Sequence, residues 1–365
     1  MRQVYSTLAV LFLIVPSVFA EGLPDGRYLY VACPGIRNYL EFGGAGIVIF
    51  DIDHDHKFVK RIETQHSRDE KPDNVKGVCA SAITGRVYFT TPKKLYCVDM
   101  LSEKTLWEKK LPQGCDRMSM TPDGKVLYVP SFEKDIWNVI DAQNGDVLAT
   151  VEPKNGAHNT VVGLDGSRMY LAGLKSNLLT VADTKTHKVL GTVGPFSASI
   201  RPFTVNGSQS LVYVNINECL GFEIGDLKTG KKLHRVEVDG FKKGAVKRHG
   251  CPSHGIGLTP EEKEVWVVDG ANQQVHVFDN TVMPPRQIKS LAVREQPGWI
   301  TFSLDGVYAY PSTGDVIEVA SKKIVTGLKD EKDRPVHSEK MVEVHWKSGK
   351  PTKTGDQFGV GRRTN

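Results

Sequence analysis

Several motifs that define common classes of protein are missing from this chain of 365 residues. It has no GxxxxGK followed by Ser or Thr and no HExxH, which argues against a P-loop nucleotide site and a zincin-type metal site. It has no CxxCH motif for covalent haem attachment. The net charge of +5 is not gathered into a basic stripe, so we expect no nucleic-acid partner.

Long apolar runs are also missing after the first 20 residues. Arg2 is followed by the apolar run Leu8–Val15 and by a small-x-Ala cleavage pattern at Val18–Ala20, which is the order of a secretory signal peptide. The apolar run is too short to serve as a membrane anchor. We therefore predict that residues 1–20 are removed and that residues 21–365 form one exported domain, periplasmic or extracellular, without membrane insertion.

What the sequence does contain is a succession of short strands and turns. The stretch Gly250–Asp279 shows the pattern, in which β-branched and aromatic runs of four to six residues alternate with turn sequences such as Thr259–Glu262. A comparable unit recurs about every 40 residues along the chain, and the 35 glycines suit its many tight turns. One such unit cannot bury both of its faces, so it needs neighbours of the same kind.

Four strands per unit and a period of this length predict an all-β, seven-bladed β-propeller with four-stranded blades. The first unit lacks an innermost strand, because nothing before Arg27 can supply one. The C-terminal run Lys340–Trp346 is a spare strand that can complete it. Such closure would leave no free sheet edge at the junction of the two chain ends.

The repeated units resemble the YVTN-type β-propeller repeat family of exported bacterial and archaeal proteins. The resemblance rests on turn–strand–turn–strand–Asp units such as TPDGKVLYVPSFEKDIWNVID and TPEEKEVWVVDGANQQVHVFD, although no blade carries the name-giving Tyr-Val-Thr-Asn intact. It implies a WD40-like propeller fold and no single activity, because the fold also hosts lactonases, lyases and electron-transfer domains.

Aligning the units places one residue from each blade at the entrance of the innermost strand, where all seven should face one mouth of the central channel. These residues are His337, Gly77, Asp116, His158, Arg201, His254 and Gly298. Three interpretations follow from this set. His158, His254 and His337 could hold a divalent metal, Arg201 and the histidines could bind a small anionic or polar molecule, or the polar residues could simply line a water-filled channel.

The longest connections should open on the same face, which is typical of a working face. The insertion Asp239–Ser253 is basic and suggests a lid or a docking patch for an anionic partner. Trp299 lies next to Gly298 and is a further candidate for ligand contact. Six cysteines in an oxidising compartment can form disulfides, and Cys219 with Cys251 is the pair we predict. The ending Gly355–Arg362 suggests a tight return after the closing strand.

Our leading hypothesis from the sequence is a monomeric, exported binding or interaction module, with a small molecule or a protein partner at the channel mouth. The first alternative is a metal-assisted lactonase or lyase that acts on a small acidic substrate. The second is a propeller subunit in periplasmic electron transfer.

Overall fold

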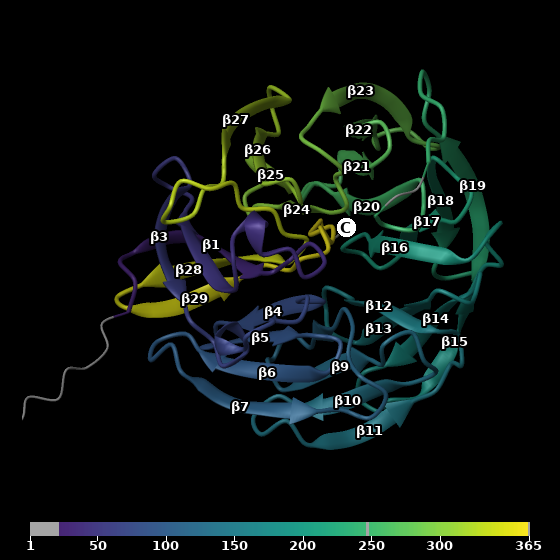
Figure 1. The fold of residues 1–365 in the computed structure, drawn as a ribbon. Coiled ribbons are helices and arrows are strands. Elements are labelled where there is room, and N and C mark those ends of the chain that lie inside the picture. The colour runs from purple at the N-terminus through teal and green to yellow at the C-terminus, as the bar shows by residue number, and fades with distance from the viewer. Residues whose placement is uncertain (1–21, 246–247, 364–365) are drawn as a thin grey trace, which may run out of the picture.

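The computed structural model describes residues 22–245 and 248–363, and it forms a ring of seven antiparallel sheets around a central axis (Figure 1). The seven-bladed propeller predicted from the repeat is thereby confirmed. The expected signal peptide, residues 1–20, lies outside the described residues. Within the described ranges, the only helices are two short 3-10 turns, η1 (Leu40–Phe42) and η2 (His66–Arg68), and no helix is suited to crossing a membrane.

Six of the sheets are built from four consecutive strands each. In the second to fourth blades these are β4 (Gly77–Ser81), β5 (Arg86–Thr90), β6 (Lys94–Asp99), β7 (Thr105–Lys110); β8 (Ser119–Met120), β9 (Val126–Pro130), β10 (Trp137–Asp141), β11 (Val147–Val151); β12 (Ala157–Val162), β13 (Arg168–Gly173), β14 (Leu179–Asp183) and β15 (Val189–Val193). In the fifth to seventh blades they are β16 (Ile200–Val205), β17 (Leu211–Ile216), β18 (Gly221–Asp226), β19 (Lys231–Glu237); β20 (Ser253–Leu258), β21 (Glu264–Asp269), β22 (Gln274–Asp279), β23 (Arg286–Ala292); β24 (Ile300–Phe302), β25 (Tyr308–Pro311), β26 (Asp315–Glu318) and β27 (Lys323–Gly327).

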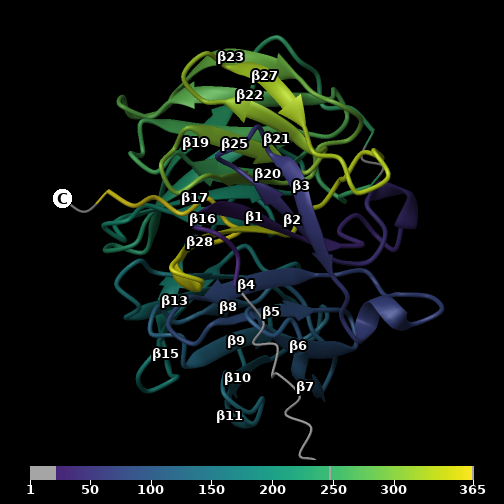
Figure 2. The same ribbon diagram turned by 90° about the vertical axis from the view of Figure 1, so that its left-hand side faces the viewer.

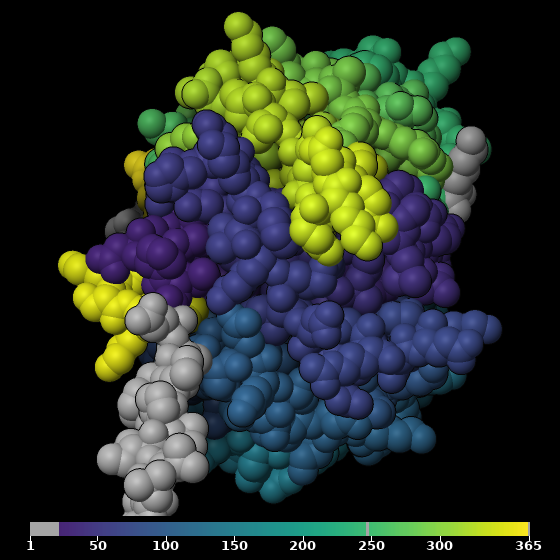
Figure 3. All heavy atoms as spheres, turned by 60° about the vertical axis from the view of Figure 1, so that its left-hand side comes forward, coloured from purple at the N-terminus to yellow at the C-terminus, as the bar shows by residue number. Residues whose placement is uncertain are grey.

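The first blade joins the two ends of the chain. It contains β1 (Gly26–Cys33), β2 (Gly46–Asp51) and β3 (Lys57–Ile62), together with β28 (Met341–Lys347) and β29 (Lys350–Thr354) from the C-terminal region. β28 pairs antiparallel with β1, which confirms the predicted closing strand, and β29 adds a fifth strand that the repeat did not predict. Figure 3 shows this seam from outside, with purple N-terminal and yellow C-terminal residues in contact.

A recurring aspartate explains where many third strands end. Asp183 Oδ1 accepts hydrogen bonds from the backbone N–H groups of Lys185 and Thr186, and Asp226 Oδ1 does the same for Lys228 and Thr229. Such Asx turns satisfy backbone donors that would otherwise be free and direct the chain back into the fourth strand. The strand–Asp pattern of the repeat is therefore turn chemistry.

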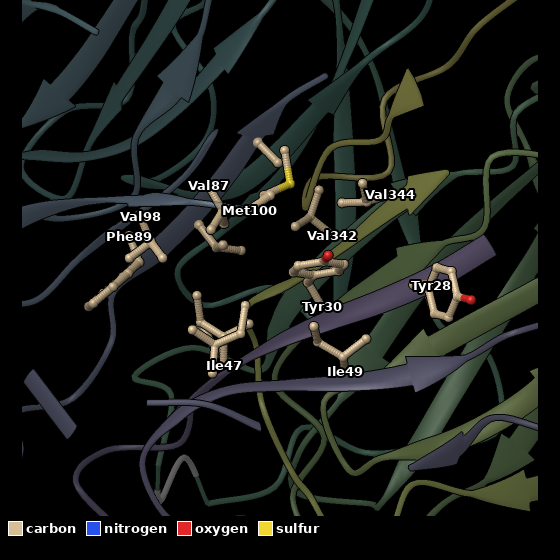
Figure 4. Packing of buried hydrophobic residues seen from close by; sticks show 14 of the residues in the cluster. Tyr28, Tyr30, Ile47, Ile49, Val87, Phe89, Val98, Met100, Val342 and Val344 are labelled. Carbon is tan, nitrogen blue, oxygen red and sulfur yellow. The ribbon is translucent and has the colours of Figure 1, made fainter. Parts of the chain in front are cut away.

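The apolar core lies between neighbouring blades. Between the first and second blades, Tyr30, Ile49 and Val342 of the first share one buried cluster with Val87 and Phe89 of the second, all at most 1 % exposed (Figure 4). The outer strands alternate instead, as β7 does, because one of their faces meets solvent. Each blade thus buries its sides against its neighbours, which is why the unit must repeat.

After β29 the chain crosses the far end of the channel. The Gln357 carbonyl oxygen accepts hydrogen bonds from Trp299 Nε1 and Thr301 Oγ1. The Gly359 carbonyl oxygen accepts two hydrogen bonds of 2.9 Å, from Thr204 Oγ1 and from Leu258 N. The segment Gly355–Arg362 therefore spans from the seventh blade to the fifth, which corrects the expected tight return. Figure 2 shows the C-terminal end on one side of the ring and the two 3-10 turns on the other.

Candidate functional site

A cavity of about 210 Å³ opens at the end of the channel where the innermost strands begin. Six cationic and two acidic side chains line it: Arg37, Lys76, Arg117, Arg201, Arg248, Lys340, Glu133 and Glu339. Three histidines, His158, His249 and His254, line it too. Three of the long connections expected on this face supply lining residues: Arg37 belongs to Cys33–Gly44, Asn74 to Thr64–Asn74 and His249 to the insertion before β20.

Strand pairing corrects two of the seven predicted ring positions. Lys76 N donates to Thr90 O just as Asp116 N donates to Pro130 O in the next blade, so Lys76, rather than Gly77, is the counterpart of Asp116. In the first blade Val31 pairs with Met341, which places Glu339 at the ring position. The ring that the structure forms is Glu339, Lys76, Asp116, His158, Arg201, His254 and Gly298.

His337 is the residue that Glu339 replaces. The His337 ring stacks on Phe42, with ring centroids 4.5 Å apart, and it is not among the residues that line the cavity. The structure therefore does not bring His337 together with His158 and His254, as the predicted metal set required. Alignment by spacing misplaced it by two residues, because the number of residues between successive ring positions differs from blade to blade.

Asp116 and His158 form a hydrogen-bonded pair in the wall of the cavity. Asp116 is fully buried, and its Oδ2 lies 2.6 Å from His158 Nδ1. Burial raises the pKa of Asp116, but His158 and Lys76 outweigh burial and hold this pKa below its ordinary value. Burial also lowers the pKa of His158, against the opposing effect of Asp116.

The geometry of this pair sets the tautomer of the imidazole. A carboxylate can only accept, so Nδ1 of His158 carries the hydrogen and Nε2 carries the lone pair. Nε2 makes no hydrogen bond to any described residue, and His158 lines the cavity. His158 can therefore accept a proton or a hydrogen bond from a molecule in the cavity.

Glu339 forms the centre of a buried ion cluster that the sequence did not reveal. It is paired with the Arg117 guanidinium, and its Oε2 lies 2.9 Å from Lys340 Nζ. Burial raises the pKa of Glu339, but Lys340 and Arg117 outweigh it and hold this pKa well below the usual range. Burial lowers the pKa of Lys340 to about 7, against the opposing effect of Glu339.

Trp299 supports this cluster from below. The Arg117 guanidinium lies over the Trp299 ring, 3.8 Å from its centroid, in a cation–π arrangement. Trp299 is 2 % exposed and does not line the cavity, so it positions Arg117 rather than offering a surface to a ligand.

The insertion before β20 folds back over the cavity. It brings His249 to Glu339, with Nδ1 3.0 Å from Oε1, and to His254, with ring centroids 4.9 Å apart. Arg201 Nη2 donates to the His249 carbonyl oxygen at 2.7 Å, which ties the insertion to β16. At the ring position of the seventh blade, a Cβ on Gly298 would lie 2.5 Å from His249 Nε2, so a side chain there would displace the His249 ring.

The predicted Cys219–Cys251 disulfide is not formed. Both thiols are free and buried, and the other four cysteines are free as well. Cys219 packs in an apolar cluster with Ile216 and Phe196, whereas Cys251 Sγ donates to the Ser253 carbonyl oxygen at 2.9 Å. The two side chains thus occupy separate environments.

Sequence reasoning found His158, Arg201 and His254 in the cavity wall and Asp116 behind it, and it missed Lys76, Arg117, His249, Glu339 and Lys340. Counting back from the closing strand could have found Glu339 and Lys340. No periodic signal marks His249, because it lies in an insertion. Together these residues make a cation-rich cavity with a proton acceptor in its wall, which suits a small oxyanion.

The fold places this protein among the β-propellers. No protein-family model and no curated protein matches the sequence. Among solved structures it is similar to Kuenenia stuttgartiensis hydrazine synthase, with a TM-score of 0.60, 12 % identity and coverage of 87 % of this chain and 98 % of that chain. It is also similar to a chain of a mitotic checkpoint complex, with a TM-score of 0.62, 13 % identity and coverage of 85 % and 95 %. These likenesses establish the propeller fold, and the YVTN repeat type stays a prediction.

Proposed function

We propose that this protein is an exported β-propeller that binds a small anionic molecule at the mouth of its central channel. The observation that carries the proposal is the charge of the cavity, which six cationic and two acidic side chains line. Some of these charges are neutralised within the wall, as Lys76 is by Asp116, with 3.6 Å between Nζ and Oδ1. Arg37 and Arg201 form no ion pair with a carboxylate among the described residues.

The size of the cavity limits the ligand. A volume of about 210 Å³ corresponds to roughly seven bulk waters. That suits a compact oxyanion such as a phosphate or a small carboxylic acid, to which Arg201 can donate through Nη1 while its Nη2 donates to the His249 carbonyl oxygen. A propeller is also a common platform for protein interactions, so an acidic side chain of a partner protein could present the same chemistry.

Isothermal titration calorimetry of the mature protein with phosphate, sulfate, acetate and citrate tests the proposal. At least one anion should bind at millimolar concentration or below, and Arg201→Gln should weaken that binding about tenfold or more. Arg235→Gln is the matched control, because Arg235 lies on β19 of the same blade and pairs with Glu237 on the outer edge. Equal affinity in both variants, or no binding of any anion to the wild-type protein, would contradict the proposal.

One observation favours a second candidate, an enzyme that transfers a proton to His158. The 2.6 Å contact with Asp116 leaves the lone pair of Nε2 toward the cavity, which is the arrangement of a general base. The test is hydrolysis of a panel of small acidic lactones and esters, followed by proton release. His158→Gln should abolish any activity while anion binding persists, and a panel without turnover would reject this candidate.

A further inference from the structure

Three side chains at one edge of the cavity form a cluster that anion binding does not explain. One potential ligand atom each from His249, His254 and Glu339 lies within 4.8 Å of the other two. His249 comes from the insertion, His254 from β20 and Glu339 from the residues just before β28. Closure of the ring therefore brings the three together. Two imidazoles and one carboxylate are ligands that suit a divalent transition metal.

His254 is held in the tautomer that a metal ligand requires. Its Nδ1 lies 2.6 Å from the Gly298 carbonyl oxygen, which can only accept, so Nδ1 carries the hydrogen. Nε2 therefore carries the lone pair, and it makes no hydrogen bond within the described part of the chain. A histidine whose second nitrogen donates to a backbone carbonyl is the usual outer-shell arrangement at metal sites.

His249 lies between two acceptors. Nε2 is 3.2 Å from the Gln296 carbonyl oxygen and must donate to it, while Nδ1 is 3.0 Å from Glu339 Oε1. If Nε2 carries the only hydrogen, the lone pairs of Nδ1 and Oε1 face each other and repel. A cation between them, either a proton or a metal ion, removes that repulsion.

Glu339 is oriented by the cations on its other side. Its Oε2 is engaged by Arg117 and by Lys340, whose Nζ lies 2.9 Å away, so Oε1 is left on the side of the two histidines. The Arg117 guanidinium is itself held in place by stacking on Trp299, 3.8 Å from the ring centroid. The carboxylate is thus presented to the imidazoles by a buried and preformed support.

We infer that His249, His254 and Glu339 bind a divalent transition metal ion, with its remaining coordination positions open to the cavity. Metal–nitrogen and metal–oxygen bonds of about 2.1 Å require the three groups to draw slightly closer than they stand. The nearby Arg117 and Lys340 repel a bare dication, so an oxyanion is expected as a further ligand. That anion rests on the proposed function, whereas the three protein ligands do not.

Metal binding can be measured directly on the mature protein. After treatment with a chelator, titration with Mn²⁺, Co²⁺ and Zn²⁺ in the presence of phosphate should show about one equivalent bound by at least one of these ions. His254→Asn and Glu339→Gln should each weaken binding by about 10- to 100-fold, since the first loses the imidazole nitrogen and the second the carboxylate charge. The Co²⁺ protein should also show ligand-field absorption bands that the two variants lack.

Two matched variants distinguish this site from histidines elsewhere in the protein. His54→Asn changes an exposed histidine paired with Asp51, and His345→Asn changes a half-buried histidine paired with Glu343 on β28. Both should bind the metal as the wild-type protein does. Circular dichroism and the melting temperature identify variants that fail to fold, and His249→Asn, in the insertion, then replaces them as the test.

The possible results distinguish the metal site from the proposed anion-binding function. No uptake of any of the three ions by the wild-type protein, or equal uptake by His254→Asn and wild type, would overturn the metal site. If chelator-treated protein still binds anions in an Arg201-dependent manner but binds no metal, the proposed function stands and the metal site falls. Metal uptake without anion binding would reject the proposed function and leave the metal site intact.

Discussion

Replacing Phe358 by Ala tests whether the C-terminal segment belongs to the core of the propeller. Phe358 is 3 % exposed and packs edge-to-face on Trp299, with ring centroids 5.9 Å apart. Truncation of a buried Phe to Ala costs about 3–5 kcal/mol of unfolding free energy. We expect the low end, about 3 kcal/mol, because Phe358 also borders a hollow of about 300 Å³ at the far end of the channel, where the surroundings are already open.

The assay is equilibrium unfolding in urea, followed by circular dichroism and tryptophan fluorescence, with Trp299 beside the substituted residue. Val325→Ala on β27 is the control, since Val325 is 51 % exposed and its truncation should change stability by no more than about 0.5 kcal/mol. If Phe358→Ala costs less than about 1 kcal/mol, the segment is a loosely attached tail and is not part of the propeller core.

Three further predictions follow from buried groups and from ring closure. His56 is buried against Tyr310, and burial lowers its pKa to about 4. As the pH falls from 6.5 to 4, the unfolded chain is protonated first, so this residue costs up to about 3 kcal/mol of stability, and His56→Asn should flatten that part of a melting-temperature profile. Asp116→Asn should cost about 3–5 kcal/mol in urea unfolding, because it leaves His158 and Lys76 without their buried partner, and a loss below 1 kcal/mol would contradict this. A chain that ends before Met341 should aggregate in light scattering, because β1 becomes a free edge, and a soluble monomer would refute the role of β28.

The blades could be predicted because their signals are local. The Asp-Gly turns, the alternating strands and the terminal aspartates each act within a few residues, and the spare strand at Lys340–Trp346 differs by one residue from β28. The cavity could be predicted only in part, because spacing places a residue to within a few positions of its counterpart. That error is large enough to put His337 at the ring position that Glu339 occupies, and Gly77 at the position that Lys76 occupies.

The remaining features depend on contacts between segments far apart in the sequence. His249 belongs to a long connection outside the repeated strands, so no alignment of repeats could place it. Gly355–Arg362 resembles a tail in composition, and only its hydrogen bonds to several inner strands reveal that it crosses the channel. Cys219 and Cys251 are both free thiols. The sequence predicts that both lie near the same mouth of the channel, but it does not say whether their side chains point toward each other.

The segment across the far end of the channel has a kinetic consequence for any molecule held at the mouth. With one end spanned, arrival and departure use the same opening, and that opening is bordered by Arg248 and His249 of the insertion. A change in the insertion that only narrows or widens the opening therefore alters the association and dissociation rates by the same factor and leaves Kd unchanged. A substitution in the insertion that acts on the opening alone therefore changes the residence time of a bound molecule without changing its affinity.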